Sequence, residues 1–354
     1  MSCLPGSKLC SLLPRSDNSP AKATGYPRSV MSDTIRIGSR GSELALWQAN
    51  HIAAQLRSSG HTVEVEVIRT TGDRMQHESV AEGPLSKGIF IKEIEEALAD
   101  GRIDLAVHSL KDLPTGLDPR FELAAIPLRA DARDAWVCEP YWSLNTLPAG
   151  GTVGTTSPRR RAMLLALRPD IRFVQMRGNI DTRLRKLSEG ACDALVLACA
   201  GLDRLHRTES VHHRFSVEEL CPAPGQGALA LETRATGYAA LSEPGHDDFV
   251  RRAVSALDEP ATRFAVEAER TVLGALGGGC QIPIGAHCRP IREGSEVLAW
   301  SLHAQVVAPD GEQVIAITAD TPFGITASAL GLQVADELRS RGALELLGET
   351  AQAG

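Results

Sequence analysis

IKEIEEALADGRIDLAVHSLKDLP, residues 91–114, contains a helix, a strand and a polar turn in direct succession. Ile91 to Ala99 has the apolar spacing of a helix, and Asp104 to His108 has the continuous apolar centre of a buried strand. A helix that leads into such a strand is typical of a mixed or parallel sheet covered by helices. We therefore predict an α/β fold.

The same alternation of strands and helices precedes this stretch and returns after Gly150. The predicted elements are Ile35 to Gly38, a helix from Ser42 to Leu56, Val63 to Val67, Thr152 to Gly154, a helix capped by Ser157, Arg172 to Met176, a helix capped by Asn179, and Ala194 to Ala198. The two series predict two domains of the same kind.

The last third of the chain has a different order of elements. Two helices, at about Asp247 to Leu257 and Pro260 to Leu276, come first. Two alternating segments, Val297 to Val307 and Glu312 to Ala319, then predict a hairpin, and a last helix follows at about Thr326 to Arg341. We expect a small third α/β domain.

The composition is that of a folded protein with several domains. The chain has 354 residues, of which 43% are hydrophobic, with 32 glycines and 20 prolines, and this excludes disordered and collagen-like classes. No apolar run is long enough to span a membrane, and the net charge of −7 disfavours nonspecific nucleic-acid binding. The eight cysteines form no C-x-x-C pair, so we expect no metal site and a reducing compartment.

Residues 1–32 contain one acidic residue, Asp17, and no apolar periodicity, so we predict a disordered extension. A transit peptide to an organelle has a similar composition, but the segment from Met31 is typical of the start of a cytosolic protein. We expect a cytoplasmic protein, with an organellar location as the alternative.

Ser109, Lys111 and Asp112 directly follow the strand that ends at His108. Ligands of open α/β sheets bind beyond the carboxyl ends of the strands, so Asp112 is a candidate acid or base. On position alone, a solvated loop that faces water explains the same residues. We expect His108 to lie in the core.

The window Val153 to Leu187 contains nine arginines or lysines and only two aspartates. Arg159 and Arg160 fall in the first turn of the helix capped by Ser157, where cations oppose the helix dipole and an anionic ligand would explain them. A basic solvated face is the alternative, and it accounts for Arg161, Arg168 and Arg185.

Two further segments have features of ligand-binding loops. Gly38 to Ser42 is a glycine-containing turn before a helix, and Lys87 is a cation before another helix. Cys280 follows three glycines, and its thiol is either a nucleophile or a buried structural cysteine.

Six blocks, taken together and in order, closely resemble the porphobilinogen deaminase family, also called hydroxymethylbilane synthases. The blocks are Gly38 to Ala49, Ala106 to Pro114, Val153 to Arg160, Arg177 to Arg183, Pro224 to Ala228 and Gly277 to Gly285. The resemblance covers nearly the whole chain from Ile35. One departure is the segment from Arg74 to Lys87, which lacks the glycine pair usual before the lysine.

The resemblance implies a fold of three α/β domains. The first two have mixed sheets similar to those of periplasmic binding proteins, around a central cleft, and the third is small and carries the cysteine loop. The expected division is a disordered extension at 1–32, a first domain at 33–129 and 224–246, a second at 130–223 and a third at 247–354.

The resemblance also implies an activity: four porphobilinogen molecules are deaminated and joined head to tail on a dipyrromethane cofactor, and hydroxymethylbilane is released. Cys280 would hold the cofactor through a thioether, Asp112 would be the catalytic acid and base, and the enzyme would be a monomeric transferase. The implied cofactor- and substrate-binding residues are Arg40, Ser42, Lys87, Ser109, Lys111, Thr155, Ser157, Arg159, Arg160, Arg177, Arg183, Arg204 and Gln226. The alternative from another class is a nonenzymatic two-domain anion-binding protein.

Overall fold

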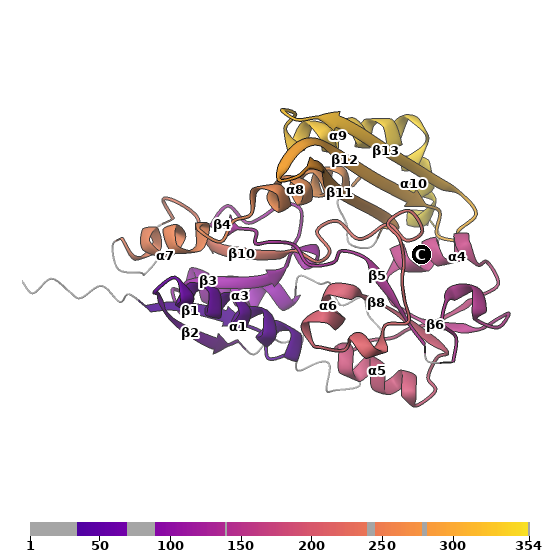
Figure 1. Ribbon diagram of the computed structural model, residues 1–354, viewed down its shortest axis with the longest axis horizontal. Helices are drawn as coiled ribbons and strands as arrows, with labels where there is room; N and C mark the ends of the chain where they lie inside the picture. Colours follow the sequence, from indigo (N-terminus) through magenta and orange to yellow (C-terminus); the bar gives the residue numbers. More distant parts are fainter. Residues whose placement is uncertain (1–33, 69–88, 139, 239–244, 278–281, 353–354) are drawn as a thin grey trace, which may run out of the picture. The chain divides into compact units, whose positions relative to one another are not determined.

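The computed structural model describes residues 34–68, 89–138, 140–238, 245–277 and 282–352 (Figure 1). The predicted extension at 1–32, Lys87 and Cys280 lie outside these ranges. Two five-stranded sheets and one three-stranded sheet, with helices packed on them, confirm the predicted α/β class.

The first sheet has the strand order β2-β1-β3-β10-β4. Its strands are β1 (Thr34–Ser39), β2 (Thr62–Val67), β3 (Leu105–Ser109), β4 (Phe121–Ala125) and β10 (Leu229–Arg234). Helices α1 (Glu43–Ser58) and α7 (His246–Ser255) pack on the face that carries Leu105 and Val107, while α3 (Ile89–Ala99) covers Ala106 on the other face. Burial of both faces explains why β3 is apolar throughout.

The second sheet has the order β7-β6-β8-β5-β9. Its strands are β5 (Asp134–Val137), β6 (Thr152–Gly154), β7 (Arg172–Val174), β8 (Ala194–Ala198) and β9 (His213–Arg214). Helix α4 (Pro158–Leu167) packs on the face of Trp136, and α5 (Ile180–Ser188) and α6 (Cys199–Arg204) pack on the other. Three short 3₁₀ helices, η1 (Leu110–Asp112), η2 (Leu144–Thr146) and η3 (Thr208–Ser210), complete the two regions.

Both sheets have the same sequence of strand directions. In each, the first three strands in the order are parallel, and the last two pairings are antiparallel. The chain leaves the first sheet after β4, builds the second from β5 to β9, and returns as β10 between β3 and β4. The second sheet is thus inserted between two strands of the first.

The two connections between the sheets contact each other. The Ala130 N–H donates to the Gly227 carbonyl at 3.2 Å, and Arg129 Nε donates to the Gln226 carbonyl at 2.8 Å. Gly227 has a φ of +88°, and a Cβ there would lie 2.6 Å from the Ala130 oxygen, so this close approach requires glycine.

The third sheet consists of β11 (Ile284–Glu293), β12 (Glu296–Val307) and β13 (Val314–Pro322), all antiparallel. Helices α8 (Pro260–Ala275), α9 (Ala327–Ser340) and α10 (Ala343–Gln352) form its core together with the sheet (Figure 1). The predicted hairpin is confirmed as β12 and β13, whereas β11 and α10 were not predicted.

A buried carboxylate joins the third sheet to the connections between the first two. Glu269 of α8 is fully buried and accepts from both terminal nitrogens of Arg129 at 2.6 and 3.0 Å. It also accepts from the backbone N–H groups of Gly225 at 2.7 Å and Cys288 of β11 at 2.8 Å. One side chain thus contacts both connections and the third sheet.

Helix α7 differs from its predicted place. The sequence analysis put residues from 247 onward in the third domain, but Val250, Ala253 and Val254 pack in the core of the first sheet. The helix follows β10 closely in the chain, and its apolar face meets the open face of that sheet.

None of the helices in the described ranges is long and apolar enough to cross a membrane.

Candidate active site

The turn that carries Asp112 is held by its leucines. Leu110 and Leu113 are buried, and the Leu113 N–H donates to the Leu110 carbonyl at 3.1 Å to close η1. Lys111 and Asp112 between them stay half-buried, while Ser109 accepts from Gln48 Nε2 at 2.9 Å. The apolar anchors therefore fix the turn and leave its two charged side chains partly accessible.

Lys111 is connected to the second sheet through Gln226. Its ammonium donates to Gln226 Oε1 at 3.1 Å, and Gln226 Nε2 donates to Asp134 Oδ1 and to the Ala132 carbonyl, both at 2.8 Å. Gln226 is almost fully buried, and its amide is occupied at both ends. Gln226 therefore links Lys111 to Asp134.

Asp134 pairs with the two arginines that the sequence placed at the start of the Ser157-capped helix. Arg159 Nη2 lies 2.6 Å from Asp134 Oδ2, and Arg160 Nη2 lies 2.7 Å from Asp134 Oδ1. Burial alone would raise the pKa of this carboxyl, but the two guanidinium charges hold its pKa well below the usual range. Asp134 thus supplies an anionic partner for both arginines from within the fold, and their binding of an anionic ligand stays a prediction.

The Asp134 cluster keeps an excess of positive charge. Two guanidinium groups meet one carboxylate, and the buried Nε of Arg159 has no hydrogen-bond partner among the residues that the structure describes. A buried donor without a partner is costly unless a ligand satisfies it. An acceptor on a bound ligand would satisfy this Nε.

Arg183 of α5 connects this cluster to the Asp112 turn. Burial and the nearby charge of Arg160 together lower the pKa of Arg183 to about 10, and the charge of Asp112 opposes both effects. Arg183 Nε donates to the Gly178 carbonyl at 2.8 Å. Asp112 from the first sheet and Arg183 and Arg160 from the second are therefore within electrostatic reach of one another.

Two more arginines lack a carboxylate partner within the described ranges. Arg204 is buried, donates to the Gly227 carbonyl at 2.7 Å and lies over the Trp47 ring, 5.9 Å from its centre. Burial lowers the pKa of Arg204 to about 10. Arg177 is exposed, and its guanidinium has no ion pair among the described residues. Both can therefore accept a carboxylate ligand.

The predicted hydroxyl groups have structural partners. Ser42 Oγ accepts from the Ala45 N–H and Ser157 Oγ from the Arg160 N–H, each at 3.4 Å, which confirms both as N-caps. Thr155 Oγ accepts from the Ser157 N–H at 3.2 Å, and Arg40 lies half-buried just before the Ser42 cap. Ligand binding by these four residues stays a prediction, as it does for Lys87 and Cys280 outside the described ranges.

Asp134 is the main residue that the sequence analysis missed. All four residues of β5 are buried, and an aspartate in such a strand is rarely left without a partner. The available signal was an aspartate at the start of a short strand whose other residues are all apolar. The partners could not be named from it, because they come from α4 and from Gln226, far along the chain.

Two family models match the chain. Residues 35–241 match "Porphobilinogen deaminase, dipyromethane cofactor binding domain", and residues 263–340 match "Porphobilinogen deaminase, C-terminal domain". The porphobilinogen deaminase of Roseiflexus sp. (strain RS-1) is 45% identical over 326 residues, which cover 90% of this chain and 99% of the relative. The chain belongs to the porphobilinogen deaminase family. The porphobilinogen deaminase of Burkholderia orbicola (strain MC0-3) is 42% identical over 336 residues, 93% of this chain and 95% of that protein.

Membership of the porphobilinogen deaminase family favours a transferase over the nonenzymatic anion-binding protein, and its first family model is named for the dipyrromethane cofactor. The described residues fit such a polycarboxylate group. Arg177 and Arg204 have no ion-paired carboxylate within the described ranges, and the buried Arg159 Nε has no hydrogen-bond acceptor there.

Solved structures of solute-binding proteins are similar to a lesser degree. The methionine-binding protein MetQ has a TM-score of 0.39 and 12% identity, and covers 63% of this chain and 90% of its own. A periplasmic substrate-binding protein from Coxiella burnetii has a TM-score of 0.36 and 14% identity, over 65% of this chain and 94% of its own. TM-scores of this size carry no functional conclusion, and the porphobilinogen deaminase assignment does not depend on them.

Proposed function

We propose that this chain deaminates four porphobilinogen molecules, joins them head to tail on a covalently bound dipyrromethane, and releases hydroxymethylbilane and ammonia. The family assignment supports the reaction class. The observation that supports the assignment to residues is that Asp112, in the turn after β3, lies close enough for its charge to raise the pKa of Arg183 of α5. A carboxylate beside the first sheet and two arginines beside the second are thus within electrostatic reach of one another.

The arginines and their neighbours would bind the carboxylates of the pyrrole rings. Each pyrrole carries an acetate and a propionate, and guanidinium groups bind carboxylates with two parallel hydrogen bonds. Arg177, Arg183 and Arg204 are the strongest candidates, because the described residues offer them no ion-paired carboxylate. Arg40, Ser42, Lys87, Ser109, Lys111, Thr155, Ser157, Arg159 and Arg160 complete the proposed set.

Gln226 and Asp134 have a supporting part in this site. Their hydrogen bonds hold the Lys111 ammonium and the Arg160 guanidinium at a fixed separation. A fixed spacing of two cations selects a ligand whose carboxylates have a matching spacing.

Asp112 would act on the reacting atoms. As an acid it gives a proton to the leaving amine, and as a carboxylate it stabilises the positive charge that then develops. As a base it later removes the proton from the pyrrole carbon that has formed the new bond. The dipyrromethane, attached at Cys280, supplies the primer on which the chain grows.

We further propose that the enzyme acts as a monomer in the cytoplasm, with the domain division 33–129 plus 224–246, 130–223 and 247–354, except that α7 (His246–Ser255) belongs to the first domain. Residues 1–32, on which the organellar alternative depends, lie outside the described ranges.

The intact mass of the purified protein tests the proposal. We expect the wild type to be heavier than its polypeptide by two linked pyrrole units, and the Cys280→Ser variant to have the bare mass. Cys288→Ala is the matched control, because burial raises the pKa of the Cys288 thiol and makes it unreactive. This variant should keep the adduct.

Protein of bare mass is incubated with porphobilinogen and weighed again. An adduct that appears then, and only when Cys280 is present, supports the proposal. No adduct after incubation, or an adduct that persists in Cys280→Ser, would refute the proposed attachment.

A further inference from the structure

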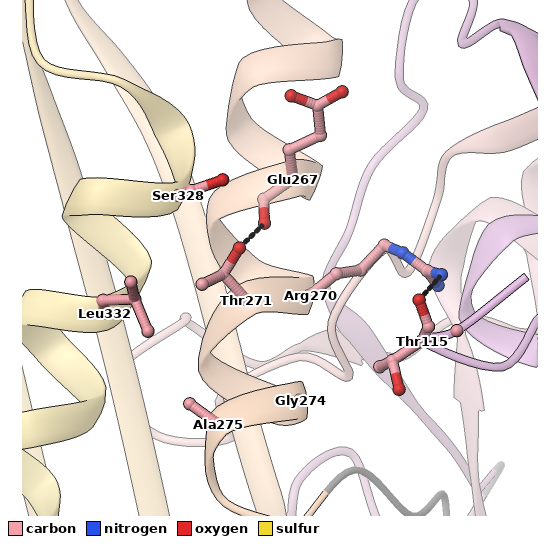
Figure 2. Close-up of a pocket in the computed structure, with 9 residues that line it drawn as sticks. Thr115, Glu267, Arg270, Thr271, Gly274, Ala275, Ser328 and Leu332 are labelled. Atoms are coloured by element: carbon pink, nitrogen blue, oxygen red, sulfur yellow. Dashed lines mark hydrogen bonds between the residues drawn. The ribbon is translucent and has the colours of Figure 1, made fainter.

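The third region consists of the third sheet with helices α8, α9 and α10. One of its arginines binds the segment of the chain directly after Asp112. Arg270 of α8 donates through Nη1 to the Leu113 carbonyl at 3.3 Å, and through Nη2 to the carbonyls of Pro114 at 2.5 Å and Thr115 at 3.3 Å. Figure 2 shows its side chain leaving α8 toward Thr115, on the side away from α9. Three successive backbone acceptors thus converge on one guanidinium.

The local sequence explains why a side chain takes this part. Leu113 is extended, and Pro114 has no N–H, so the backbone cannot continue the 3₁₀ turn or donate to a neighbouring strand at that residue. A guanidinium offers several donors in a planar fork, which matches a short row of carbonyls. Arg270 therefore supplies donors to the carbonyls of a segment that cannot continue the 3₁₀ turn.

An apolar contact accompanies the polar one. Val266, one turn before Arg270 on α8, is fully buried in a cluster with Leu110 and Leu113, the two anchors of the Asp112 turn. Residues four apart lie on the same face of a helix. One face of α8 therefore holds the Asp112 turn at two points.

A surface pocket of about 520 Å³ lies on the other side of this contact, between α8, α9 and Thr115 (Figure 2). Glu267, Thr271 and Leu332 contribute to its walls, and none of the predicted active-site residues in the described ranges lines it. The Arg270 contact therefore borders a surface depression; its hydrogen bonds to Leu113 and Thr115 are partly buried, and the one to Pro114 is exposed. Such a contact adds less to global stability than a core residue does, but it can still fix a loop.

We propose that Arg270 is a positioning residue, which holds the Asp112 turn at the place where the carboxylate meets the substrate. This inference rests on the proposed function, because it takes Asp112 as the catalytic group. The third region, through α8, thereby sets the geometry of a residue carried by the first sheet. Small displacements of a catalytic group are costly, since about 1 Å can reduce the rate on the order of 100-fold.

Arg263 is the matched control. It lies on the same helix and also attaches α8 to the first sheet, with Nη2 donating to the Leu123 carbonyl at 3.1 Å and an ion pair to Asp258 at 2.8 Å. Its acceptor belongs to β4 and not to the Asp112 turn. Loss of Arg263 weakens the attachment of α8 without releasing Asp112.

The experiment compares cofactor-loaded protein of Arg270→Gln, Arg270→Lys, Arg263→Gln and Asp112→Asn, with kcat, KM and Tm measured for each. We expect kcat of Arg270→Gln to fall about tenfold, equivalent to ~1.4 kcal/mol in the barrier, with KM within about twofold. Arg270→Lys should recover part of kcat, because an ammonium replaces some of the donors. Arg263→Gln should lower Tm at least as much as Arg270→Gln and leave kcat within about twofold of the wild type.

Equal kcat losses in Arg270→Gln and Arg263→Gln, or an unchanged kcat in Arg270→Gln, would overturn the positioning role. If Arg270→Gln does not fold, Arg270→Lys decides: a lowered kcat at the wild-type Tm supports the role, and a wild-type kcat removes it. Turnover by Asp112→Asn at the wild-type rate would instead refute the catalytic part of the proposed function, which is a separate outcome.

Discussion

The arginines of the candidate site fall into two physical classes. Arg159 and Arg160 are buried on Asp134 and contribute charge from within the fold. Arg177 is exposed and has no ion pair among the described residues. Removal of a member of the first class leaves a buried carboxylate with fewer partners, whereas Arg177 can be removed without that penalty. Substitution should therefore affect stability in one class and ligand binding in the other.

For Arg177→Gln we expect a KM for porphobilinogen raised about tenfold, since a charge-assisted hydrogen bond to a carboxylate contributes roughly 1.5–3 kcal/mol. The Tm should stay within about 1 °C of the wild type, because an exposed side chain without partners stabilises little. Steady-state kinetics and thermal unfolding measure the two effects.

Arg185→Gln is the control for Arg177, because Arg185 is an exposed arginine of α5 paired with Glu189 at 2.5 Å. Its KM should not change. A similar rise of KM in both variants would indicate a general loss of positive charge instead of a specific contact.

At this scale the sequence predicted residues whose signal is local. The caps Ser42 and Ser157 and the placement of Asp112 after β3 follow from neighbours within a few positions. The pairing of Asp134 with Arg159 and the link through Gln226 depend on contacts between segments far apart in the chain. No local pattern specifies such contacts.

At the scale of elements, the sequence did not predict β4, β5, β9 and β10, nor β11, which is the longest of these strands. Its second half contains Arg289, Pro290, Arg292 and Glu293 and lacks a clear alternation, so it resembles a loop. The strand forms because β12 provides partners along its whole length. Sheet neighbours thus override a weak local preference.

His287 of β11 makes the third region sensitive to acid. Burial lowers the pKa of His287 to about 4, with the charges of Arg129, Arg289 and His303 acting in the same direction and that of Glu269 against them. The unfolded chain binds this proton near pH 6.5 and the folded chain only near pH 4. Stability therefore falls as the pH decreases through this window, by about 3 kcal/mol from this group.

Urea unfolding at pH 7 and at pH 4.5 measures this loss, and His287→Gln should lose less stability between the two than the wild type does. His213→Gln, at a half-exposed histidine, should retain the wild-type pH dependence. The assignment fails if His287→Gln shows the same decrease as the wild type.

At the scale of the whole molecule, Glu269 is the side chain on which the connection of the third region depends. Its carboxylate accepts four hydrogen bonds, from Arg129, Gly225 and Cys288. We expect Glu269→Ala to lower the free energy of unfolding by about 3–5 kcal/mol, because Arg129 is then left without its counter-ion. We also expect the wild type to unfold in one calorimetric transition and Glu269→Ala in two, with the third region unfolding apart from the first two.

Arg341→Ala is a suitable control for calorimetry, because its ion pair with Glu337 lies on the exposed surface of the third region. It should shift Tm little and keep one transition. A single transition in Glu269→Ala would mean that other contacts, such as those of Arg270 and Val266, are enough to unfold the regions together.

The three-sheet organisation followed from periodicity and from the order of elements, but the return of the chain to the first sheet did not. Strand β10 is as apolar as β3 in its first half, and only its pairing between β3 and β4 reveals the insertion. A local sequence pattern cannot predict which strands pair when they are more than a hundred residues apart.

This insertion also determines when the first sheet can be completed during synthesis. The ribosome makes β1 to β4 first, but β4 has its described pairing only with β10, which emerges after the entire second sheet. At roughly 5–20 residues per second, β3 waits with one open edge for several seconds while the second sheet is translated. The first sheet is therefore the first to be synthesised but is completed only after the second sheet. During translation, a chaperone is needed most at the unpaired edge of β3.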